Sequence, residues 1–314
     1  MDSFNGWCQK EKVIFVMGAT GTGKSKLSID LATQFPAEII NSDKMQVYKG
    51  LDIVTNKITE EDRCGVPHHV LGVVDPNAKF TVYDFRYLVS LAVESILGRN
   101  RIPIIVGGSN SYIKALVDDE EHDFRSKYEC CFLWVDVALP VLYPYLSYRV
   151  DQMVEAGLVK ELREFFEPKA DYNRGIRSAI GVPEMDQYLR AEIITDTDEK
   201  TLKMLLETSI NDIKTNTCQL ACRQLQKILH LENLPEWTDM HHIDATKVFQ
   251  KRGREADEVW EELVACPCKT IVKKFLYSSI TNNTNPLTSK SLANSTPFSI
   301  TSAAMNTIVL TATH

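Results

Sequence analysis

The sequence predicts an α/β fold, in which helices flank a parallel β-sheet, followed by a second, mainly helical domain. The sheet is predicted by short runs of apolar, β-branched residues that alternate with segments of helical spacing. Such runs are typical of strands that are buried on both faces. The helical domain is predicted because apolar residues after Pro140 recur at the spacing of a helix.

The first half of the chain contains the expected strands. They lie at 13–17, 37–40, 102–106 and 131–137. The first strand ends in a glycine-rich loop, after which the segment 24–35 places Leu27, Leu31 and Ala32 on one helical face. This order of strand, loop, helix and strand is typical of a parallel sheet covered by helices.

The second half is expected to be mainly helical. Residues 142–167 have apolar side chains at helical spacing, with Gly157 as an internal weak point, and further helices are expected at 183–191, 199–230 and 254–264. No acidic residue follows Glu262, and the last part of the chain is rich in Ser, Thr and Asn. The predicted organisation is an α/β domain at 11–141, a helical domain at 142–265 that closes over the site, and a disordered tail at 266–314.

The composition limits the possible partners. A net charge of −7 over 314 residues and a pI near 5.6 argue against broad electrostatic binding to nucleic acid or to an anionic membrane. No apolar run approaches the roughly 18 residues of a membrane helix, and the N-terminus, MDSFNGWCQKEK, resembles neither a signal peptide nor a transit peptide. We therefore expect no nucleic acid and no membrane among the partners. The expected location is cytoplasmic, or a plastid if a transit peptide has been removed.

The strongest motif is GATGTGKS, which matches G-x-x-x-x-G-K-[ST] and stands between a strand and a helix. It comprises Gly18, Ala19, Thr20, Gly21, Thr22, Gly23, Lys24 and Ser25. In such a P-loop the backbone N–H groups surround a phosphate, Lys24 neutralises it and the Ser25 hydroxyl holds Mg²⁺. The motif therefore predicts a P-loop NTPase-like sheet that binds a diphosphate or a triphosphate. A kinase would also need a metal-binding aspartate, for which Asp136 is the best candidate, although alone it is more typical of a strand end.

The stretch NSDKMQVYKGLDIVTNK at 41–57 directly follows the second strand. Because the carboxyl ends of parallel strands face the ligand, Asp43 should point toward the crevice that contains the P-loop. A general base would lie there. On spacing alone, it is equally possible that Ser42 or Asp43 only caps the helix that follows.

Seven segments, in unbroken order over about residues 12–265, resemble the isopentenyltransferases, and more narrowly the plant adenylate isopentenyltransferases that make cytokinins. The tRNA dimethylallyltransferases are relatives of that group. The segments are GATGTGKS, NSDKMQVYKGLDIVTNK, GVPHHVLGVVDP at 65–76, VGGSNSYIKAL at 106–116, RVDQMVEAGLVKEL at 149–162, GIRSAIGVPEMDQYL at 175–189 and NTCQLACRQLQKI at 216–228.

The resemblance implies that the N6 amine of adenine attacks C1 of dimethylallyl diphosphate and that diphosphate leaves. The P-loop then holds the diphosphate of this prenyl donor together with Mg²⁺. An aryl amine is a poor nucleophile, so a carboxylate close to N6–H must accept its proton, and Asp43 matches the residue of the family in that role. Thr22 and Arg177 are assigned to catalysis with it.

The resemblance also implies further contacts to the donor. Arg177 and Arg223 align with arginines that close over the donor, and Ser109 adds a hydroxyl. From the residues alone, each arginine is more typical of a solvated helix face. Many relatives carry a second basic residue after the first of these arginines, where this chain has Ser178.

Three readings of the acceptor remain: a free adenine nucleotide, adenine in tRNA, or the phosphoryl acceptor of a small-molecule kinase. Only about two dozen residues separate the strands that end at 106 and begin at 131, which leaves little room for the helical insertion of tRNA enzymes. A kinase leaves NSDKMQVYKG unexplained. The plant group prefers ATP or ADP over AMP, and Lys247 and Lys251 are candidates for the extra phosphates. It is at least as plausible that these two lysines lie on a charged helix exterior.

Overall fold

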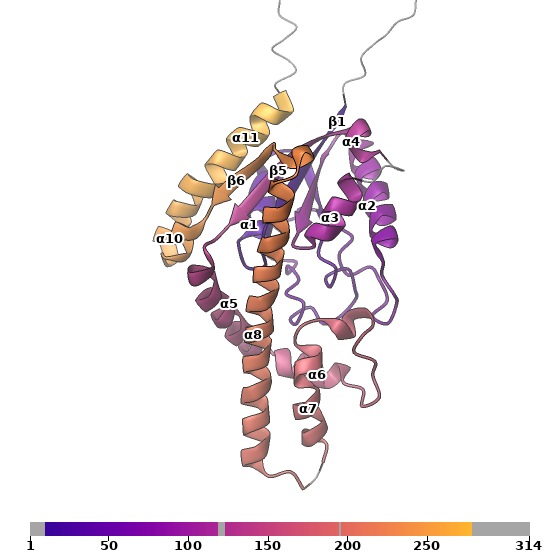
Figure 1. The fold of residues 1–314 in the computed structure, drawn as a ribbon, viewed down its shortest axis with the longest axis vertical. Helices are drawn as coiled ribbons and strands as arrows, with labels where there is room; N and C mark the ends of the chain where they lie inside the picture. The colour runs from indigo at the N-terminus through magenta and orange to yellow at the C-terminus, as the bar shows by residue number, and fades with distance from the viewer. Residues whose placement is uncertain (1–9, 119–122, 195, 278–314) are drawn as a thin grey trace, which may run out of the picture. The chain divides into compact units, whose positions relative to one another are not determined.

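A parallel β-sheet of six strands lies at the centre of the residues that the computed structural model describes, which are 10–118, 123–194 and 196–277 (Figure 1). The strands are β1 Glu11–Met17, β2 Ala37–Asn41, β3 His68–His69, β4 Ile102–Gly107, β5 Tyr128–Asp136 and β6 Met240–Asp244. Their order across the sheet is β3-β2-β4-β1-β5-β6, and every pairing is parallel. The predicted parallel sheet, with its P-loop between the first strand and the first helix, is confirmed.

Helices cover both faces of this sheet and extend beyond it (Figure 1). The first half contains α1 Lys24–Gln34, α2 Val82–Leu97, α3 Asn110–Val117 and α4 Phe124–Lys127. The second half contains α5 Leu139–Glu155, α6 Leu158–Phe165, α7 Val182–Glu192, α8 Glu199–Glu232, α9 Thr246–Phe249, α10 Gly253–Trp260 and α11 Cys266–Tyr277. Within the described part of the chain, none of the helices is both long enough and apolar enough to cross a membrane.

Strand β1 shows why the sequence predicts a buried sheet. Its side chains alternate between two apolar layers, because successive residues of a strand point to opposite faces. Phe15 and Met17 belong to the layer that contains α2 and α3, whereas Ile14 and Val16 belong to the layer that contains α1 and α11. Both faces are buried from Val13 to Met17, so this part of the strand is an unbroken apolar run.

The helical segment expected at 142–167 forms two helices, which are divided at the weak point Gly157. Helix α5 ends at Glu155 and α6 begins at Leu158, because Gly157 adopts a φ of 107°, in the left-handed region that favours glycine. Helix α8 then runs from the far end of the helical part back to the sheet, with α7 packed beside it (Figure 1).

Two parts of the second half differ from expectation. Residues 240–244, assigned to a mainly helical domain, form the edge strand β6 and pair with β5. Residues 266–277, assigned to the disordered tail, form α11, whose Cys268 and Val272 are buried in the apolar layer of α1. The rest of the expected tail, 278–314, lies outside the described residues.

The carboxylate of Glu161 on α6 holds the segment between β2 and β3. Its Oε1 accepts the backbone N–H of Ile53 at 3.0 Å, and its Oε2 accepts that of Val54 at 2.9 Å. Both donors lie in a turn outside the sheet, so this side chain provides partners that the sheet cannot.

We predict that Glu161→Ala lowers the free energy of unfolding by about 2–4 kcal/mol, because two backbone N–H groups lose their acceptor. Urea denaturation measures the change. Glu164→Ala on the same helix is the control, since its carboxylate only approaches Lys160 at 3.9 Å on the surface, and should change stability by less than about 0.5 kcal/mol. Equal effects of the two substitutions would contradict this account.

Candidate functional site

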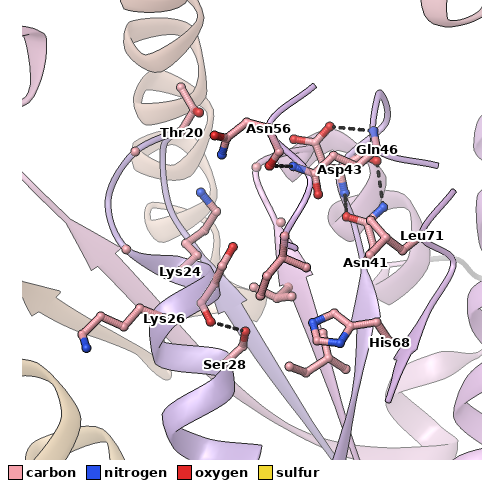
Figure 2. A pocket seen from close by; sticks show the side chains of 18 of the residues that line it. Thr20, Lys24, Lys26, Ser28, Asn41, Asp43, Gln46, Asn56, His68 and Leu71 are labelled. Carbon is pink, nitrogen blue, oxygen red and sulfur yellow. Dashed lines mark hydrogen bonds between the residues drawn. The ribbon is translucent and has the colours of Figure 1, made fainter. Parts of the chain in front are cut away.

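A cavity of about 360 Å³ lies at the carboxyl ends of β1, β2 and β4 (Figure 2). Its walls come from the P-loop, from the segments that follow β2 and β4, and from one face each of α5 and α8. Of the predicted site residues, the structure brings together Thr20, Gly21, Gly23, Lys24, Ser25 and Asp43 around this cavity. The expected convergence of the P-loop and Asp43 is therefore observed.

The P-loop leads directly into α1. Gly23 precedes the helix with a φ of 93°, and a Cβ at this position would lie 2.7 Å from the ring of Trp260, so only glycine fits. Lys24 begins the helix and donates from Nζ to the carbonyl of Ala19 at 2.6 Å. Burial lowers the pKa of Lys24 to about 8, although the nearby Asp43 opposes the shift. Among the described residues this ammonium has no carboxylate within ion-pair distance, so a bound anion would stabilise it.

Gln224 of α8 connects segments that are far apart in the sequence. Its Oε1 accepts the backbone N–H of Thr20 at 2.8 Å, and its Nε2 donates to the carbonyl of Gly108 at 3.0 Å. Its own carbonyl accepts from Asn110 Nδ2 at 3.1 Å. A Cβ at Gly108 would lie 2.3 Å from Gln224 Nε2, so a side chain there would displace the amide and break its hydrogen bonds. The helical half of the chain thereby fixes the P-loop against the end of β4.

Asp43 both caps a turn and borders the cavity. Its Oδ1 accepts the backbone N–H of Met45 at 2.9 Å and, more weakly, that of Gln46 at 3.4 Å. Its Oδ2 has no hydrogen-bond partner in the part of the chain that is described, and Figure 2 shows the carboxylate on the other side of the cavity from Lys24. The capping role that spacing allowed is observed, although the segment that follows is a turn and not a helix, and the cap leaves one carboxylate oxygen at the cavity.

Arg149 of α5 is a second cation at the cavity. Its NH2 donates to Thr20 Oγ1 at 3.0 Å, while its buried Nε has no hydrogen-bond partner within the described residues. Burial lowers the pKa of Arg149 below its ordinary value, and the nearby Tyr145 and Asp43 only partly oppose this. A partly buried guanidinium without a carboxylate partner is unfavourable, which indicates that this wall suits an anion.

The cavity also has apolar lining residues. Ile39, Ile58 and Leu71 are among them, together with His68. Figure 2 shows Leu71 and His68 on the same side of the cavity as Asn41. The Nδ1 of His68 donates to the carbonyl of Val66 at 2.8 Å, and burial lowers the pKa of this imidazole, so the ring is neutral at pH 7. The cavity therefore combines cationic and apolar lining residues.

Four predicted residues do not line the cavity although they belong to the segments around it: Gly18, Ala19, Thr22 and Ser109. Thr22 is fully buried, and its hydroxyl donates to the carbonyl of Ala19 at 3.0 Å, so its side chain stabilises the conformation of the P-loop. Ser109 Oγ accepts the backbone N–H of Lys44 at 3.0 Å, directly beside Asp43. In this structure both hydroxyls hold backbone segments.

The two arginines predicted to close over the donor do not border the cavity. Arg177 pairs with Glu167 at 2.8 Å, and its guanidinium lies 4.5 Å from the ring centre of Phe165. Arg223 precedes Gln224 but lies on the exposed side of α8, where it lines a separate hollow beside α3.

The remaining predicted residues lie on other surfaces. Lys247 on α9 and Lys251 after it do not line the cavity, and Lys251 pairs with Glu255 at 2.6 Å. Asp136, the aspartate that a kinase would need, also lies outside the cavity, 3.3 Å from His242 Nε2.

Arg149 and Gln224 are the main residues of the site that the sequence analysis missed. Helical spacing alone could have indicated that both side chains face inward. Gln224 follows the buried Ala221 by three residues, and Arg149 follows the buried Leu146 by three, so each shares the inward face of its helix. Spacing indicates such a face, but it does not indicate that the face meets the P-loop.

The model of the IPP transferase family matches residues 46–127 and 119–228. Adenylate isopentenyltransferase 5, chloroplastic, of Arabidopsis thaliana is 60% identical over 270 residues, which cover 85% of this chain and 81% of that protein. Adenylate isopentenyltransferase 7, mitochondrial, of the same plant is 54% identical, with coverage of 88% and 83%. The adenylate isopentenyltransferase of Humulus lupulus is 46% identical, with coverage of 83% and 89%.

Solved structures with the same fold act on tRNA. A eukaryotic dimethylallyltransferase acting on tRNA superimposes with a TM-score of 0.69 at 27% identity, covering 86% of this chain and 80% of the other. The tRNA isopentenylpyrophosphate transferase of Bacillus halodurans gives a TM-score of 0.64 at 28% identity, covering 86% of this chain and 100% of that chain.

The lowered pKa of Lys24 predicts that anion binding weakens above about pH 8. Below this pH the ammonium is charged in the free cavity; above it, binding must first take up a proton, which costs affinity. We expect the affinity for inorganic diphosphate to fall about tenfold or more between pH 7.5 and pH 9.5, measured by calorimetry and expressed relative to Lys24→Arg. The arginine keeps its charge at these pH values, so the comparison cancels the ionisation of the ligand. A constant ratio would show that Lys24 does not bind the anion.

Arg149→Met should separate stability from anion binding. The substitution removes a partly buried cation that has no carboxylate partner. The free energy of unfolding should therefore stay unchanged or rise by up to about 1–4 kcal/mol, and the melting temperature should not fall. The same change should abolish most of the increase in melting temperature that inorganic diphosphate produces. Lys214→Met, which removes a surface pair with Asp151 at 2.6 Å, is the control and should keep that increase. A large loss of stability in Arg149→Met, with diphosphate still binding, would contradict this assignment.

Proposed function

The chain belongs to the IPP transferase family, and we propose that it transfers the dimethylallyl group of dimethylallyl diphosphate to the N6 amine of a free adenine nucleotide. This is the first step of cytokinin synthesis. The observation that carries the proposal is the cavity in which the P-loop cation Lys24 and the oriented carboxylate of Asp43 line facing walls. The chain is a prenyl-transferring enzyme, since its relatives at 54–60% identity are adenylate isopentenyltransferases.

The donor fits the two chemical parts of the cavity. Its diphosphate lies against the P-loop, where Lys24 and Arg149 supply positive charge that the described protein residues leave without a carboxylate partner. Its five-carbon chain lies against the apolar lining residues Ile39, Ile58 and Leu71. A site with fixed cations at the leaving diphosphate stabilises the charge that develops as the C1–O bond breaks.

We also propose that Mg²⁺ binds with the diphosphate. The residues present fit such an ion, because the Ser25 hydroxyl lines the cavity beside Lys24, and Mg²⁺ prefers oxygen ligands from one or two protein groups, phosphates and water. When bound, the ion neutralises part of the diphosphate charge. The protein contributes the hydroxyl and the surrounding N–H donors.

Asp43 supports the chemistry at the other substrate. As the lone pair of N6 forms a bond to C1, the C1–O bond breaks, and the electron pair of that bond leaves with diphosphate. The proton released from N6 passes to Asp43, whose Oδ2 is the oxygen that the turn leaves free. The cap through Oδ1 keeps this carboxylate pointed at the amine, so little ordering is needed during the reaction.

Other assignments stay predictions of the family resemblance. Thr22, Ser109, Arg177 and Arg223 do not line the cavity in this structure, so a direct contact with the donor would require a rearrangement. Lys247 and Lys251 as contacts for the outer phosphates of ATP or ADP also stay predictions.

The acceptor is the point on which the relatives and the solved structures differ. The structural neighbours act on tRNA, but they are only 27–28% identical to this chain. The adenylate isopentenyltransferases reach 60% identity and support a free nucleotide. We propose ATP and ADP as the preferred acceptors, with AMP weaker.

The purified protein should be incubated with Mg²⁺, dimethylallyl diphosphate and, separately, ATP, ADP, AMP and unmodified tRNA. Mass spectrometry then identifies prenylated adenine. Product with ATP or ADP supports the proposal, and product with tRNA alone would overturn the choice of acceptor while leaving the chemistry intact.

The compartment is proposed from the relatives. The similar adenylate isopentenyltransferases include chloroplastic and mitochondrial enzymes, so we propose that the working enzyme resides in an organelle, most simply a plastid. The cytoplasmic location expected from the N-terminal residues stays a prediction.

Asp43→Ala should keep the fold and the affinity for dimethylallyl diphosphate but reduce kcat by about 10²-fold or more, because the base is lost. Asp43→Asn is the informative partner, since it can still cap the turn through its side-chain oxygen but cannot accept the proton. Steady-state turnover and donor binding by calorimetry separate the effects. Near wild-type turnover in Asp43→Asn would mean that the residue is only a cap.

A further inference from the structure

Asn41, the last residue of β2, has a side chain that bonds to the backbone of Asp43. Its Oδ1 accepts the backbone N–H of Asp43 at 3.0 Å, and its Nδ2 donates to the carbonyl of Asp43 at 3.0 Å. Asn41 is only 5% exposed, and Figure 2 shows it beside Asp43. One buried amide therefore binds both backbone polar groups of the residue that carries the free carboxylate oxygen.

The same amide also reaches the segment that follows β3. The Nδ2 of Asn41 donates to the carbonyl of Val70 at 3.0 Å. Val70 has a φ of 58°, which a β-branched residue rarely adopts, so its conformation depends on the contacts that hold it. His68 and Leu71, on either side of it, line the cavity. Asn41 thus connects the backbone of Asp43 to this part of the cavity wall.

The hydrogen-bond pattern allows one orientation of the Asn41 amide. The N–H of Asp43 needs an acceptor, and the carbonyls of Asp43 and Val70 need donors, so Oδ1 must face the first and Nδ2 the other two. Both hydrogens of Nδ2 are used in this way. Although Asn41 lines the cavity, its amide has no hydrogen left to donate to a ligand, so it acts through Asp43.

Strand β4 holds the same segment from the other side. The N–H of Ser42 donates to the carbonyl of Val106 at 2.7 Å. A Cβ at Gly107 would lie 2.4 Å from the carbonyl carbon of Ser42 and 2.8 Å from the nitrogen of Asp43, so the two backbones are in close contact. With β4 on one side, Asn41 provides the contact on the side of β3. Without its amide, the peptide groups of Asp43 lose these partners and can turn.

We propose that Asn41 is a positioning residue for the base: its amide fixes the backbone of Asp43 and thereby the direction of the carboxylate. The inference rests on the proposed function, in which that carboxylate accepts the N6 proton. The bond to Val70 also holds the base at a set distance from Leu71, against which the donor chain lies. One side chain therefore aligns the base with the place where the donor binds.

The test is a double-mutant cycle between Asn41 and Asp43, with kcat measured at saturating donor and ATP. Asn41→Ala should lower kcat about tenfold, because a carboxylate displaced by roughly 1 Å accepts the proton poorly. In the Asp43→Asn background the base is already absent, so the same substitution should lower the remaining kcat less than about twofold. A side chain that only stabilises the fold would lower kcat by the same factor in both backgrounds.

Asn110→Ala is the matched control. Asn110 is an equally buried asparagine, 1% exposed, and its Nδ2 donates to the carbonyl of Gln224 at 3.1 Å and not to Asp43. Any decrease of kcat that its loss produces should be the same with Asp43 and with Asp43→Asn, since this side chain does not act through the base.

Asn41→Ser provides a second variant if Asn41→Ala does not fold. The serine hydroxyl can still accept the N–H of Asp43, but it cannot donate to both carbonyls. Its kcat should lie between those of the wild type and Asn41→Ala, about threefold below the wild type, and this decrease should also disappear in the Asp43→Asn background.

Two results would overturn the inference while leaving the proposed function intact. One is an unchanged kcat in the variants of Asn41. The other is a decrease of equal size with Asp43 and with Asp43→Asn. Near wild-type turnover in Asp43→Asn alone would instead contradict the role of Asp43 as the base, and the inference would fail with it.

Discussion

Two partly buried cations, Lys24 and Arg149, determine what this site can bind. Both line the cavity at the carboxyl edge of the sheet, both have a pKa lowered by burial, and neither has a carboxylate within ion-pair distance among the described residues. Keeping such charges out of water is unfavourable unless an anion joins them. The diphosphate of the prenyl donor supplies that anion. The unpaired cations lower the stability of the free protein, and they increase its affinity for the donor.

The rest of the architecture holds these cations beside Asp43. The parallel sheet brings the P-loop after β1 and Asp43 after β2 to one edge, which follows from the strand order alone. The helical half then completes the cavity: α5 contributes Arg149, and α8 contributes Gln224, whose amide bonds the P-loop and the end of β4. Each half alone would leave the site without one wall.

Much of this could be predicted from the sequence, and the exceptions have physical causes. The buried strands, the P-loop and Asp43 were predictable because an apolar run, a glycine pattern and a strand end are local signals. Strand β6, MHHID, was missed because it lies at the edge of the sheet with mostly exposed side chains, so it has no apolar run. Helix α11 was taken for a tail on composition, although Cys268 and Val272 face the core. The walls formed by Arg149 and Gln224 depend on how distant helices pack, which spacing does not encode.

The central claim is that the P-loop holds the diphosphate of the prenyl donor and not the phosphates of the nucleotide. A crystal structure of the protein with dimethylallyl thiolodiphosphate, in which sulfur replaces the bridging oxygen at C1, together with Mg²⁺ and ADP tests it most directly. The account predicts the diphosphate of the analogue against Lys24 and Arg149, with the adenine N6 within hydrogen-bond distance of Asp43. Phosphates of ADP on the P-loop, with the analogue elsewhere, would contradict it.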